Sequence, residues 1–510
     1  MCEHRTASQL VVGALLIVLC ALHGAGAATA QVINSFEGDH GPSQTVCKSN
    51  GAPIHCDRAE MDVATSGKQV VQVTWQNVNV YDSAGRLLKS TPLAALIRSV
   101  GLDPNPPKGG GPFEPHIVYN EFIERWIITV TCANDCTLVS ANADAAGEWG
   151  GTYLSCLEGG PCLDRNPGIK LGYDKNGVYI CGGHVGDDNP NTVPTASYDC
   201  FALSSQEGAA IGLGKAPTRL NRAHNMPLDI VPAVDHNRSK DPSAPAFFAN
   251  KSCDRVAPYS CQRSANFSFH WIVNTFTWNG AAGTYNFGGS QQVIKTDIGS
   301  RENKWLYNSP CCGPTMSIPQ AGNEFTLRAA TSHRLMNVVQ RGSYLYGVLG
   351  TGPCTEACGS QGADANNVLI WVELDCTTAN ACVVSQTAKL SNPNYHVEFG
   401  TIGVSDAGDL GIVGTSLSAR ANLSVLLWTR RQSDPANTFT GPTTVVAGAQ
   451  PYTCANDKNV SPMGNSVGIL TSLDPVDRET LWTTQQWAND AAPCVWNTRV
   501  IGYKIAPQRR

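Results

Sequence analysis

The stretch HIVYNEFIERWIITV (116–130) contains two apolar runs separated by a short polar break at Asn120, and an Arg-Trp pair opens the second run. The same order recurs near the C-terminus in ILTSLDPVDRETLWTTQ (469–485), where Asp474 marks the break and Trp482 opens the next run. Val, Ile and Trp favour strands, whereas Asn and Asp favour tight turns. Both stretches therefore predict a β-hairpin, and their recurrence predicts a repeat.

Three further stretches have the same outline. In VVQVTWQNVNVYDSAGRLL (70–88) apolar and polar residues alternate before a turn that ends in Gly85. GYDKNGVYICGG (172–183) places Asn-Gly between apolar runs, a pair that predicts a turn with positive backbone φ angles. GVSDAGDLGIVGT (403–415) has Gly408 at the corresponding position. Helical periodicity is nearly absent, so these stretches predict an all-β chain.

Seven units of this kind can be aligned, and most begin about 50–65 residues apart. A repeat of this length with several short strands per unit is typical of a β-propeller, in which each unit forms a four-stranded blade. One blade cannot bury both faces, whereas a ring of blades can. We therefore expect one seven-bladed β-propeller over residues 31–510, with a long insertion within 235–330. The hairpins are expected to begin near Val70, Ile117, Ile169, Ile230, Leu335, Ile402 and Gly468.

The clearest helical segment is TPLAALIRSVG (91–101). Its apolar residues fall on one face, Pro92 suits the first turn and Gly101 suits a helix end. Thr91 is the expected N-cap.

Two stretches resemble the blade pattern of secreted β-propeller proteins of the broad sialidase-like class. FEPHIVYNEFIERW (113–126) has an acidic residue and Pro before an extended run, then a turn and Arg-Trp. MGNSVGILTSLDPVDRETLWTTQQW (463–487) resembles a terminal blade with Asp-Pro-x-Asp and Leu-Trp. The nearest match to the repeated Asp box of true sialidases, SDAGDLG (405–411), lacks the Thr-Trp ending. The resemblance therefore implies the fold and little about activity.

Residues 1–30 have the features of a secretory signal peptide. Arg5 supplies charge, LVVGALLIVLCAL (10–22) is apolar but short for a membrane span, and small residues follow at 25–30. The mature chain is expected to begin near Ala28 or Gln31 and to be secreted, with no membrane span.

The cysteines predict a disulfide framework in an oxidising compartment. Of the twenty, Cys2 and Cys20 fall in the signal peptide, and no Cys-x-x-Cys occurs that would favour zinc. The sequence leaves their connectivity open. The candidates are Cys47, Cys56, Cys132, Cys136, Cys156, Cys162, Cys181, Cys200, Cys253, Cys261, Cys311, Cys312, Cys354, Cys358, Cys376, Cys382, Cys454 and Cys494.

The surface is expected to be polar and weakly charged. The 36 basic and 41 acidic residues give a net charge of −5, and charged residues make up 15% of the chain, against about 25% in typical globular proteins. Without a basic stripe we expect no nucleic-acid partner. A monomer that meets an extracellular glycan or a secreted protein is expected. Five Asn-x-Ser sequons predict glycosylation in a eukaryotic host, at Asn237, Asn250, Asn266, Asn422 and Asn459.

Histidines recur near predicted blade starts and early loops, and a ring of imidazoles could supply a general base near neutral pH. Propeller polysaccharide lyases use His and Tyr in this manner. We predict His116, His184 and His396 as catalytic candidates because each lies beside a strand end. The accessory candidates are Tyr173 and Arg334, with Tyr395 and Arg328 as alternatives; the other recurring histidines are His236, His270 and His333. A structural role is the alternative for each.

Three further motifs match patterns of functional sites. GHVGDDNPN (183–191) offers oxygen ligands for a structural Ca²⁺, although it lacks the EF-hand spacing, so the cofactor stays unknown. GNSVG (464–468) matches the hydrolase elbow around Ser466, but the residues after it predict a strand, and the elbow needs a helix. Cys311-Cys312 could form a vicinal disulfide of a redox propeller.

Three functions therefore remain open, and fold alone cannot rank them. The first is a glycan-directed lyase or hydrolase that acts in the propeller funnel. The second is a non-catalytic binding or scaffold propeller. The third is a redox propeller.

Overall fold

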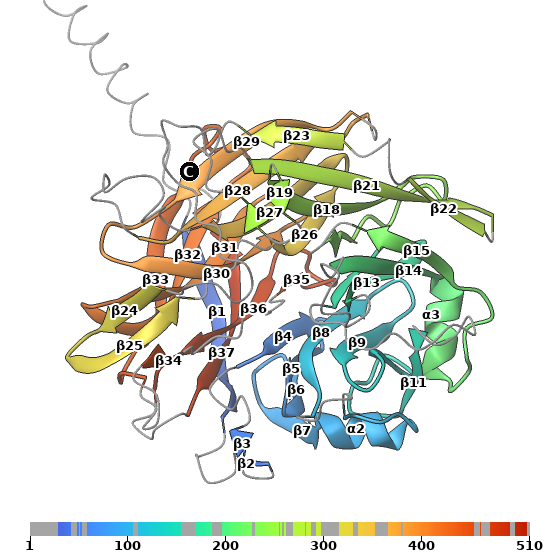
Figure 1. Cartoon of the computed structure of the whole chain (residues 1–510), viewed down its shortest axis with the longest axis horizontal. Coiled ribbons are helices and arrows are strands. Elements are labelled where there is room, and N and C mark those ends of the chain that lie inside the picture. The colour runs from blue at the N-terminus through green and yellow to red at the C-terminus, as the bar shows by residue number, and fades with distance from the viewer. Residues whose placement is uncertain are drawn as a thin grey trace, which may run out of the picture.

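The chain is all-β, with two helices among the residues described, α2 (Leu93–Ser99) and α3 (Ser205–Gly212) (Figure 1). The structure is a computed structural model. It describes residues 29–41, 48–49, 52–53, 59–105, 111–154, 169–185, 196–226, 230–253, 255–257, 260–261, 269–280, 282–286, 292–296, 316–329, 335–351, 366–378, 381–452, 459–460, 470–489 and 495–506.

Four-stranded antiparallel sheets are the main building unit, and their strands follow one another in sequence. The first is β4 (Met61–Thr65), β5 (Gln69–Thr74), β6 (Asn77–Asp82) and β7 (Leu87–Pro92). The second is β8 (Phe113–Asn120), β9 (Arg125–Thr131), β10 (Cys136–Ser140) and β11 (Trp149–Tyr153). Another is β30 (His396–Val404), β31 (Leu410–Ser418), β32 (Ala421–Arg430) and β33 (Thr440–Gly448).

Two more such runs lie within one nine-stranded sheet. One run is β12 (Lys170–Tyr173), β13 (Gly177–Val185), β14 (Ala196–Ser204) and β15 (Asn221–Met226). The other is β26 (Leu335–Arg341), β27 (Tyr344–Thr351), β28 (Val368–Asp375) and β29 (Val383–Leu390). The short strand β17 (Val234–Asp235) joins them, because it pairs in parallel with both β12 and β26. The innermost strands are therefore hydrogen-bonded to each other across this part of the centre.

The segment between β15 and β26 contributes a five-stranded sheet and several short pairs. The sheet consists of β16 (Val231–Pro232), β18 (Ala246–Cys253), β21 (Phe269–Asn279), β22 (Ala282–Asn286) and β23 (Gln292–Thr296). The hairpin β24 (Met316–Gln320) and β25 (Asn323–Ala329) pairs with β34 (Asn459–Val460). The remaining pairs are β2 (Lys48–Ser49) with β3 (Ala52–Pro53), and β19 (Arg255–Ala257) with β20 (Ser260–Cys261).

The N-terminal strand completes the C-terminal sheet. The strand β1 (Ala30–His40) pairs with β37 (Asn497–Ile505), which continues to β36 (Leu481–Trp487) and β35 (Thr471–Leu473). This sheet packs against β4, so the two ends of the chain meet, as the neighbouring blue and red strands in Figure 1 show. The sheets follow one another around a common centre in a propeller-like arrangement.

Side-chain hydrogen bonds at the turns explain why a polar residue separates the two apolar runs of each repeat. In the hairpin β8–β9 the Oδ1 atom of Asn120 accepts from the backbone N–H of Phe122 at 3.0 Å, and in β35–β36 Asp474 accepts from Val476 at 2.9 Å. Such Asx turns reverse the chain directly after an inner strand. Thr65, Asp174 and Asp235 make the same contact to the residue two positions on.

The predicted hairpins near Val70, Ile117, Ile169, Leu335 and Ile402 are confirmed. The hairpin expected near Ile230 is wrong, because β16 pairs with β18 and β17 lies between them in the chain. Gly468 lies outside the described residues.

Two details of the confirmed hairpins also differ from the prediction. The turn at 174–177 uses the carboxylate of Asp174 as acceptor, and neither Asn176 nor Gly177 has a positive φ angle. The first repeat begins one strand before Val70, at β4. Gly408 does adopt a positive φ of 79° in the β30–β31 turn.

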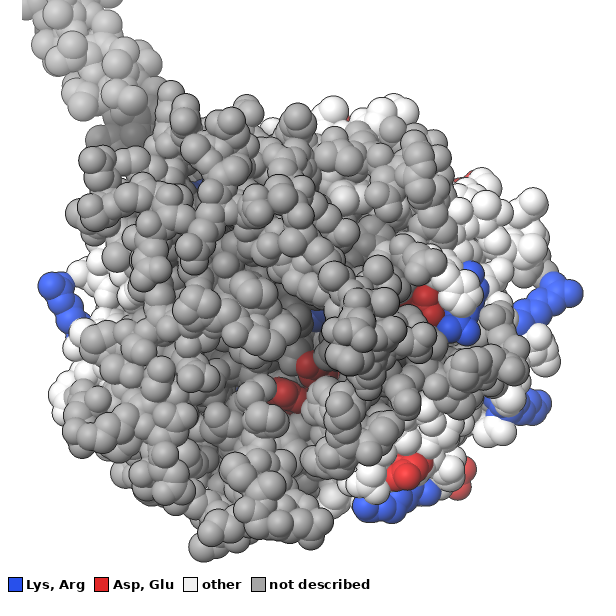
Figure 2. Space-filling model, in the orientation of Figure 1, with Lys and Arg blue, Asp and Glu red and all other residues white. Residues whose placement is uncertain are grey.

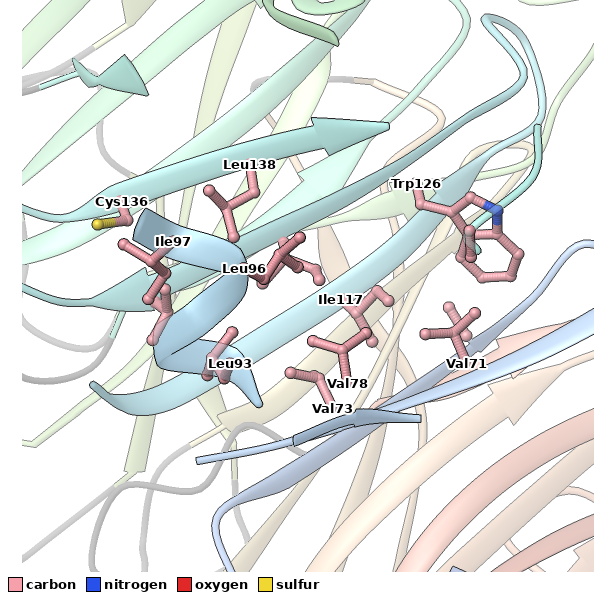
Figure 3. Packing of buried hydrophobic residues seen from close by; sticks show 14 of the residues in the cluster. Val71, Val73, Val78, Leu93, Leu96, Ile97, Ile117, Trp126, Cys136 and Leu138 are labelled. Atoms are coloured by element: carbon pink, nitrogen blue, oxygen red, sulfur yellow. The ribbon is translucent and has the colours of Figure 1, made fainter. Parts of the chain in front are cut away.

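Helix α2 is confirmed, but its expected cap is wrong. Thr91 still belongs to β7 and pairs with Val78, so the helix follows the strand directly with Pro92 at the N-cap and no side-chain cap. Leu93, Leu96 and Ile97 are buried against residues of the first two sheets (Figure 3). The packed side chains include Val71, Val73, Val78, Ile117, Trp126, Cys136 and Leu138. Helix and sheets thus share one apolar core, which fixes β4 and β8 side by side.

A buried polar network joins the first sheet to the last. The Nε2 atom of Gln72 donates to the Oγ1 atoms of Thr484 and Thr498, and its Oε1 atom accepts from the backbone of Asp39. Gln72 and Thr484 are fully buried. Buried polar groups are costly unless paired, so these bonds fix the contact between β5 and the last sheet.

Three disulfides lie within the described residues: Cys132–Cys136, Cys181–Cys200 and Cys376–Cys382. Each joins two of the candidate cysteines that follow one another directly in the chain. The side chains of the other cysteines lie outside the described residues, as do residues 1–28 of the predicted signal peptide and the sequon Asn266.

The remaining sequons differ in exposure. Asn250 is 3% exposed inside the ladder of β18 and β21, so the folded chain has no room for a glycan there. Asn237 and Asn422 are partly exposed. No helix among the described residues is long and apolar enough to cross a membrane.

Candidate functional site

Six polar side chains gather where the inner strands end. They come from the turns or last residues of inner strands in different sheets, and hydrogen bonds or ion pairs connect them into one cluster. The cluster, here called the mouth cluster, consists of Glu121, Tyr173, His236, Arg341, Asp406 and Arg478.

Three members of the mouth cluster form a hydrogen-bonded triad. The Nδ1 atom of His236 lies 2.8 Å from the Oε1 atom of Glu121, and the hydroxyl of Tyr173 donates to the Oε2 atom at 2.7 Å. The same hydroxyl lies 3.2 Å from Nδ1 of His236. A carboxylate can only accept, so Nδ1 carries a proton, and in the neutral ring Nε2 is the nitrogen with the free lone pair. Glu121 thereby orients His236 as a base.

The protonation of this triad follows from its neighbours. Burial alone would raise the pKa of Glu121, but the charge and hydrogen bond of His236 and the hydroxyl of Tyr173 outweigh it and lower the pKa to about 2. Burial, reinforced by Glu121, raises the pKa of Tyr173 well above its ordinary value. The carboxylate is therefore ionised and the phenol stays protonated near neutral pH.

The two arginines of the mouth cluster flank Asp406. Arg478 donates to both carboxylate oxygens of Asp406, through Nε and, at 2.9 Å, through Nη2. The Nη2 atom also donates to the backbone carbonyl of His236 at 2.8 Å, and Nη1 lies 3.7 Å from Glu121. Arg341 lies 3.9 Å from Asp406 through Nε. Arg478 thus connects the last sheet to residues of three other sheets.

Tyr173, His236 and Arg341 line one pocket together with apolar residues of β4, β8 and β26. Its free volume is about 20 Å³, room for about one water molecule. His236 and Arg341 thus line the same space. A base beside a cation can remove a proton from carbon or water and stabilise the negative charge that develops.

His116 has a different environment. Its Nδ1 atom lies 3.5 Å from Oδ2 of Asp62, and both side chains are buried. Burial, with the nearby charge of Lys170, lowers the pKa of His116 well below its ordinary value. The neutral ring lies between the inner strands and is 1% exposed, so we assign it a structural role.

His396 also lies in a separate environment. The half-buried ring of His396 accepts from the backbone N–H of Asn367 at 3.2 Å, and burial lowers its pKa to about 4. His184 lies in β13 opposite Ser197, and its side chain is outside the described part of the structure, as is all of Arg334. Among the predicted catalytic candidates, only Tyr173 belongs to the mouth cluster.

Asp62 holds three inner segments together. Its carboxylate accepts from the backbone N–H groups of Val63, Ile117 and Leu470 at 2.8, 3.0 and 2.8 Å. Burial raises its pKa from 3.8 to about 8, although these hydrogen bonds oppose the shift. The folded state therefore binds a proton at Asp62 that the unfolded state releases.

This proton predicts a pH dependence of stability. Because the folded pKa is the higher one, the stabilisation from Asp62 is complete below about pH 4 and is lost as the pH rises through about 8. The difference in free energy of unfolding between wild type and Asp62→Asn should shrink over this window and then level off. Urea unfolding of both proteins in matched buffers measures it. A difference that grows with pH would contradict the assignment.

The sequence contains one pattern that identifies most of the mouth-cluster residues that were not among the predicted catalytic candidates. Glu121, His236, Arg341 and Asp406 each directly follow the residue that opens an inner turn, namely Asn120, Asp235, Gln340 and Ser405. An alignment of the repeats on the turn opener would therefore have placed these four in one column. Arg478 lies further along its turn and would not have been found this way.

No group of three or more His, Cys, Asp or Glu side chains within the described ranges could hold a metal ion. The loop considered for Ca²⁺ lies outside them from residue 186 on, as do Ser466 and Cys311-Cys312. Near the middle of the face drawn in Figure 2, described acidic side chains lie beside a basic one.

No protein-family model matches the chain, and no curated protein matches it in sequence. Among solved structures, the plexin A4 extracellular region aligns with a TM-score of 0.45 and 9% identity over 88% of this chain and 40% of that one. A protein of unknown function from Dyadobacter fermentans aligns with a TM-score of 0.39 and 6% identity, over 94% of this chain and 99% of that one. An ulvan lyase of polysaccharide lyase family PL25 aligns with a TM-score of 0.39 and 10% identity, over 92% of this chain and 95% of that one.

The chain spans less than half the length of the plexin A4 regions that it matches. At these TM-scores none of the three likenesses carries an argument about this protein. The function has to be argued from its residues.

Proposed function

We propose that the protein is a secreted, closed seven-bladed β-propeller that cleaves an extracellular glycan at the mouth cluster. One observation carries the proposal: Glu121 holds His236 in the tautomer of a base, in a pocket that Arg341 also lines. Six of the seven proposed blades have four strands, the five-stranded sheet that contains β18 and β21 is the other blade, and the N-terminal strand closes the ring.

In this proposal His236 removes a proton through Nε2, and Glu121 stabilises the imidazolium that forms. Arg341 stabilises negative charge on the substrate. Tyr173 keeps its proton and holds the carboxylate of Glu121. The arrangement fits a lyase, which takes the proton from carbon, and a hydrolase, which takes it from water.

The test is to incubate the purified mature protein with a panel of acidic and neutral polysaccharides. New reducing ends are expected with at least one of them. Ultraviolet absorbance of an unsaturated sugar in the product would identify a lyase, and its absence a hydrolase. No new reducing ends with any polysaccharide that the protein binds would contradict the enzymatic proposal.

The second candidate is a binding propeller without catalysis. It is favoured by the small free volume of the pocket, about 20 Å³, which admits no sugar. Binding of a glycan without product in the same assay would support this candidate.

A further inference from the structure

Both arginines of the mouth cluster keep a buried nitrogen without a hydrogen-bond partner. In Arg341, Nη1 and Nη2 donate to the backbone carbonyls of Gln340 and Val404, which leaves Nε. In Arg478, Nε and Nη2 are used and Nη1 is left. Buried donors of charged groups are costly to leave unpaired, so such a pair calls for an acceptor.

Asp406 partly supplies that acceptor from an exposed turn. Its side chain is 43% exposed, whereas those of Arg341 and Arg478 are 14% and 19% exposed. The turn does not depend on this carboxylate, because Ser405 binds the backbone of Gly408 and Asp409. The backbone N–H of Asp406 is also held separately, by the carbonyl of Arg478. The carboxylate can therefore leave while the turn keeps its own bonds.

We propose that Arg341 and Arg478 form a subsite for the anionic group of an acidic sugar, and that Asp406 occupies this subsite in the free protein. The anionic group is a carboxylate or a sulfate ester, both of which a guanidinium binds through paired N–H donors. This inference rests on the proposed function, since it names the substrate class of the same site.

The charges of the cluster agree with an exchange of one anion for another. Both carboxylate oxygens of Glu121 are hydrogen-bonded, one to His236 and one to Tyr173, so Glu121 does not fully neutralise the two arginines. A sugar anion that replaces Asp406 leaves the local charge unchanged. When Asp406 is displaced, Arg478 keeps its hydrogen bond to the backbone carbonyl of His236.

The test measures binding of glucuronate, glucose 6-sulfate and glucose by calorimetry. The variant Asp406→Asn removes the competing charge and keeps the shape of the side chain. It is expected to bind one or both anions about tenfold more tightly than wild type, a factor equal to 1.4 kcal/mol, and glucose no better. Adding Arg341→Gln to Asp406→Asn should cancel the gain. The preferred anion then identifies the carboxylate or the sulfate ester as the natural group.

Asp82→Asn is the matched control, since Asp82 also pairs with an arginine on an exposed turn, at 3.1 Å from Arg86. It should leave all affinities unchanged. Asp406→Ser serves as a second variant, and thermal unfolding of each protein checks the fold. Unchanged or weaker anion binding in both folded Asp406 variants would overturn the subsite and leave Asp406 as a structural ion pair.

The outcome separates the subsite from the proposed function. If His236 is needed for glycan cleavage but the Asp406 variants gain no affinity, the catalytic proposal stands and the subsite falls. If the Asp406 variants gain affinity while a His236 variant keeps full activity, the subsite stands and the catalytic proposal falls.

Discussion

Replacing Asp62 with Ala is expected to lower the free energy of unfolding by roughly 3–9 kcal/mol, because each of three buried donors left unpaired costs about 1–3 kcal/mol. The side chain is fully buried and accepts from the N–H groups of Val63, Ile117 and Leu470. Ala can replace none of these contacts. A loss of this size is a large part of the 5–15 kcal/mol typical of a folded domain.

Urea unfolding of the wild type and of Asp62→Ala measures the loss. Asp82→Ala is the control, since Asp82 makes comparable bonds to the N–H groups of Ala84 and Arg86 in an exposed turn. The control should change stability far less. If Asp62→Ala lost no more than Asp82→Ala, the carboxylate would not connect β4, β8 and the segment before β35.

The second large effect concerns catalysis. Replacing His236 with Asn should lower the rate of glycan cleavage by about 10²–10⁴-fold, the usual contribution of a general base. The amide of Asn can still donate to Glu121, so the fold and the carboxylate environment should survive. Initial rates of reducing-end formation measure the effect.

His224 offers a matched control. Its Nδ1 atom also lies near a carboxylate, 3.3 Å from Asp199, but the side chain is 59% exposed and lies on β15 away from the mouth cluster. His224→Asn should keep the wild-type rate. Equal rates for His236→Asn and wild type would remove His236 from the mechanism.

The hairpins could be predicted from the sequence because their information is local. Asn120 and Asp474 open turns through their own side chains, and the apolar runs beside them need no distant partner to be recognised as strands. The cap of α2 was mispredicted because pairing of Thr91 with Val78, a contact between strands, overrides the local capping preference.

The mouth cluster was harder to predict, because it depends on which strand ends meet. The sequence predicts a role for Tyr173 beside a histidine, and the described partner is His236, which was not among the three preferred histidines. His236 follows the turn opener Asp235, whereas His116 begins an apolar run, and this difference becomes visible only when the repeats are aligned on their turns. His116 and Asp62 show the consequence, since both are charged residue types that the packed sheets bury.

Closure of the ring requires that the first and last sheets meet, since only then do the ends of the inner strands come together in one mouth cluster. A double-mutant cycle on Gln72 and Thr484 tests this contact in solution, because their side chains share a buried hydrogen bond of 2.8 Å across 412 residues of sequence. Unfolding free energies of Gln72→Ala, Thr484→Ala and the double variant give the coupling. A closed ring predicts a coupling of about 0.5–3 kcal/mol, whereas a coupling indistinguishable from zero would contradict the closure.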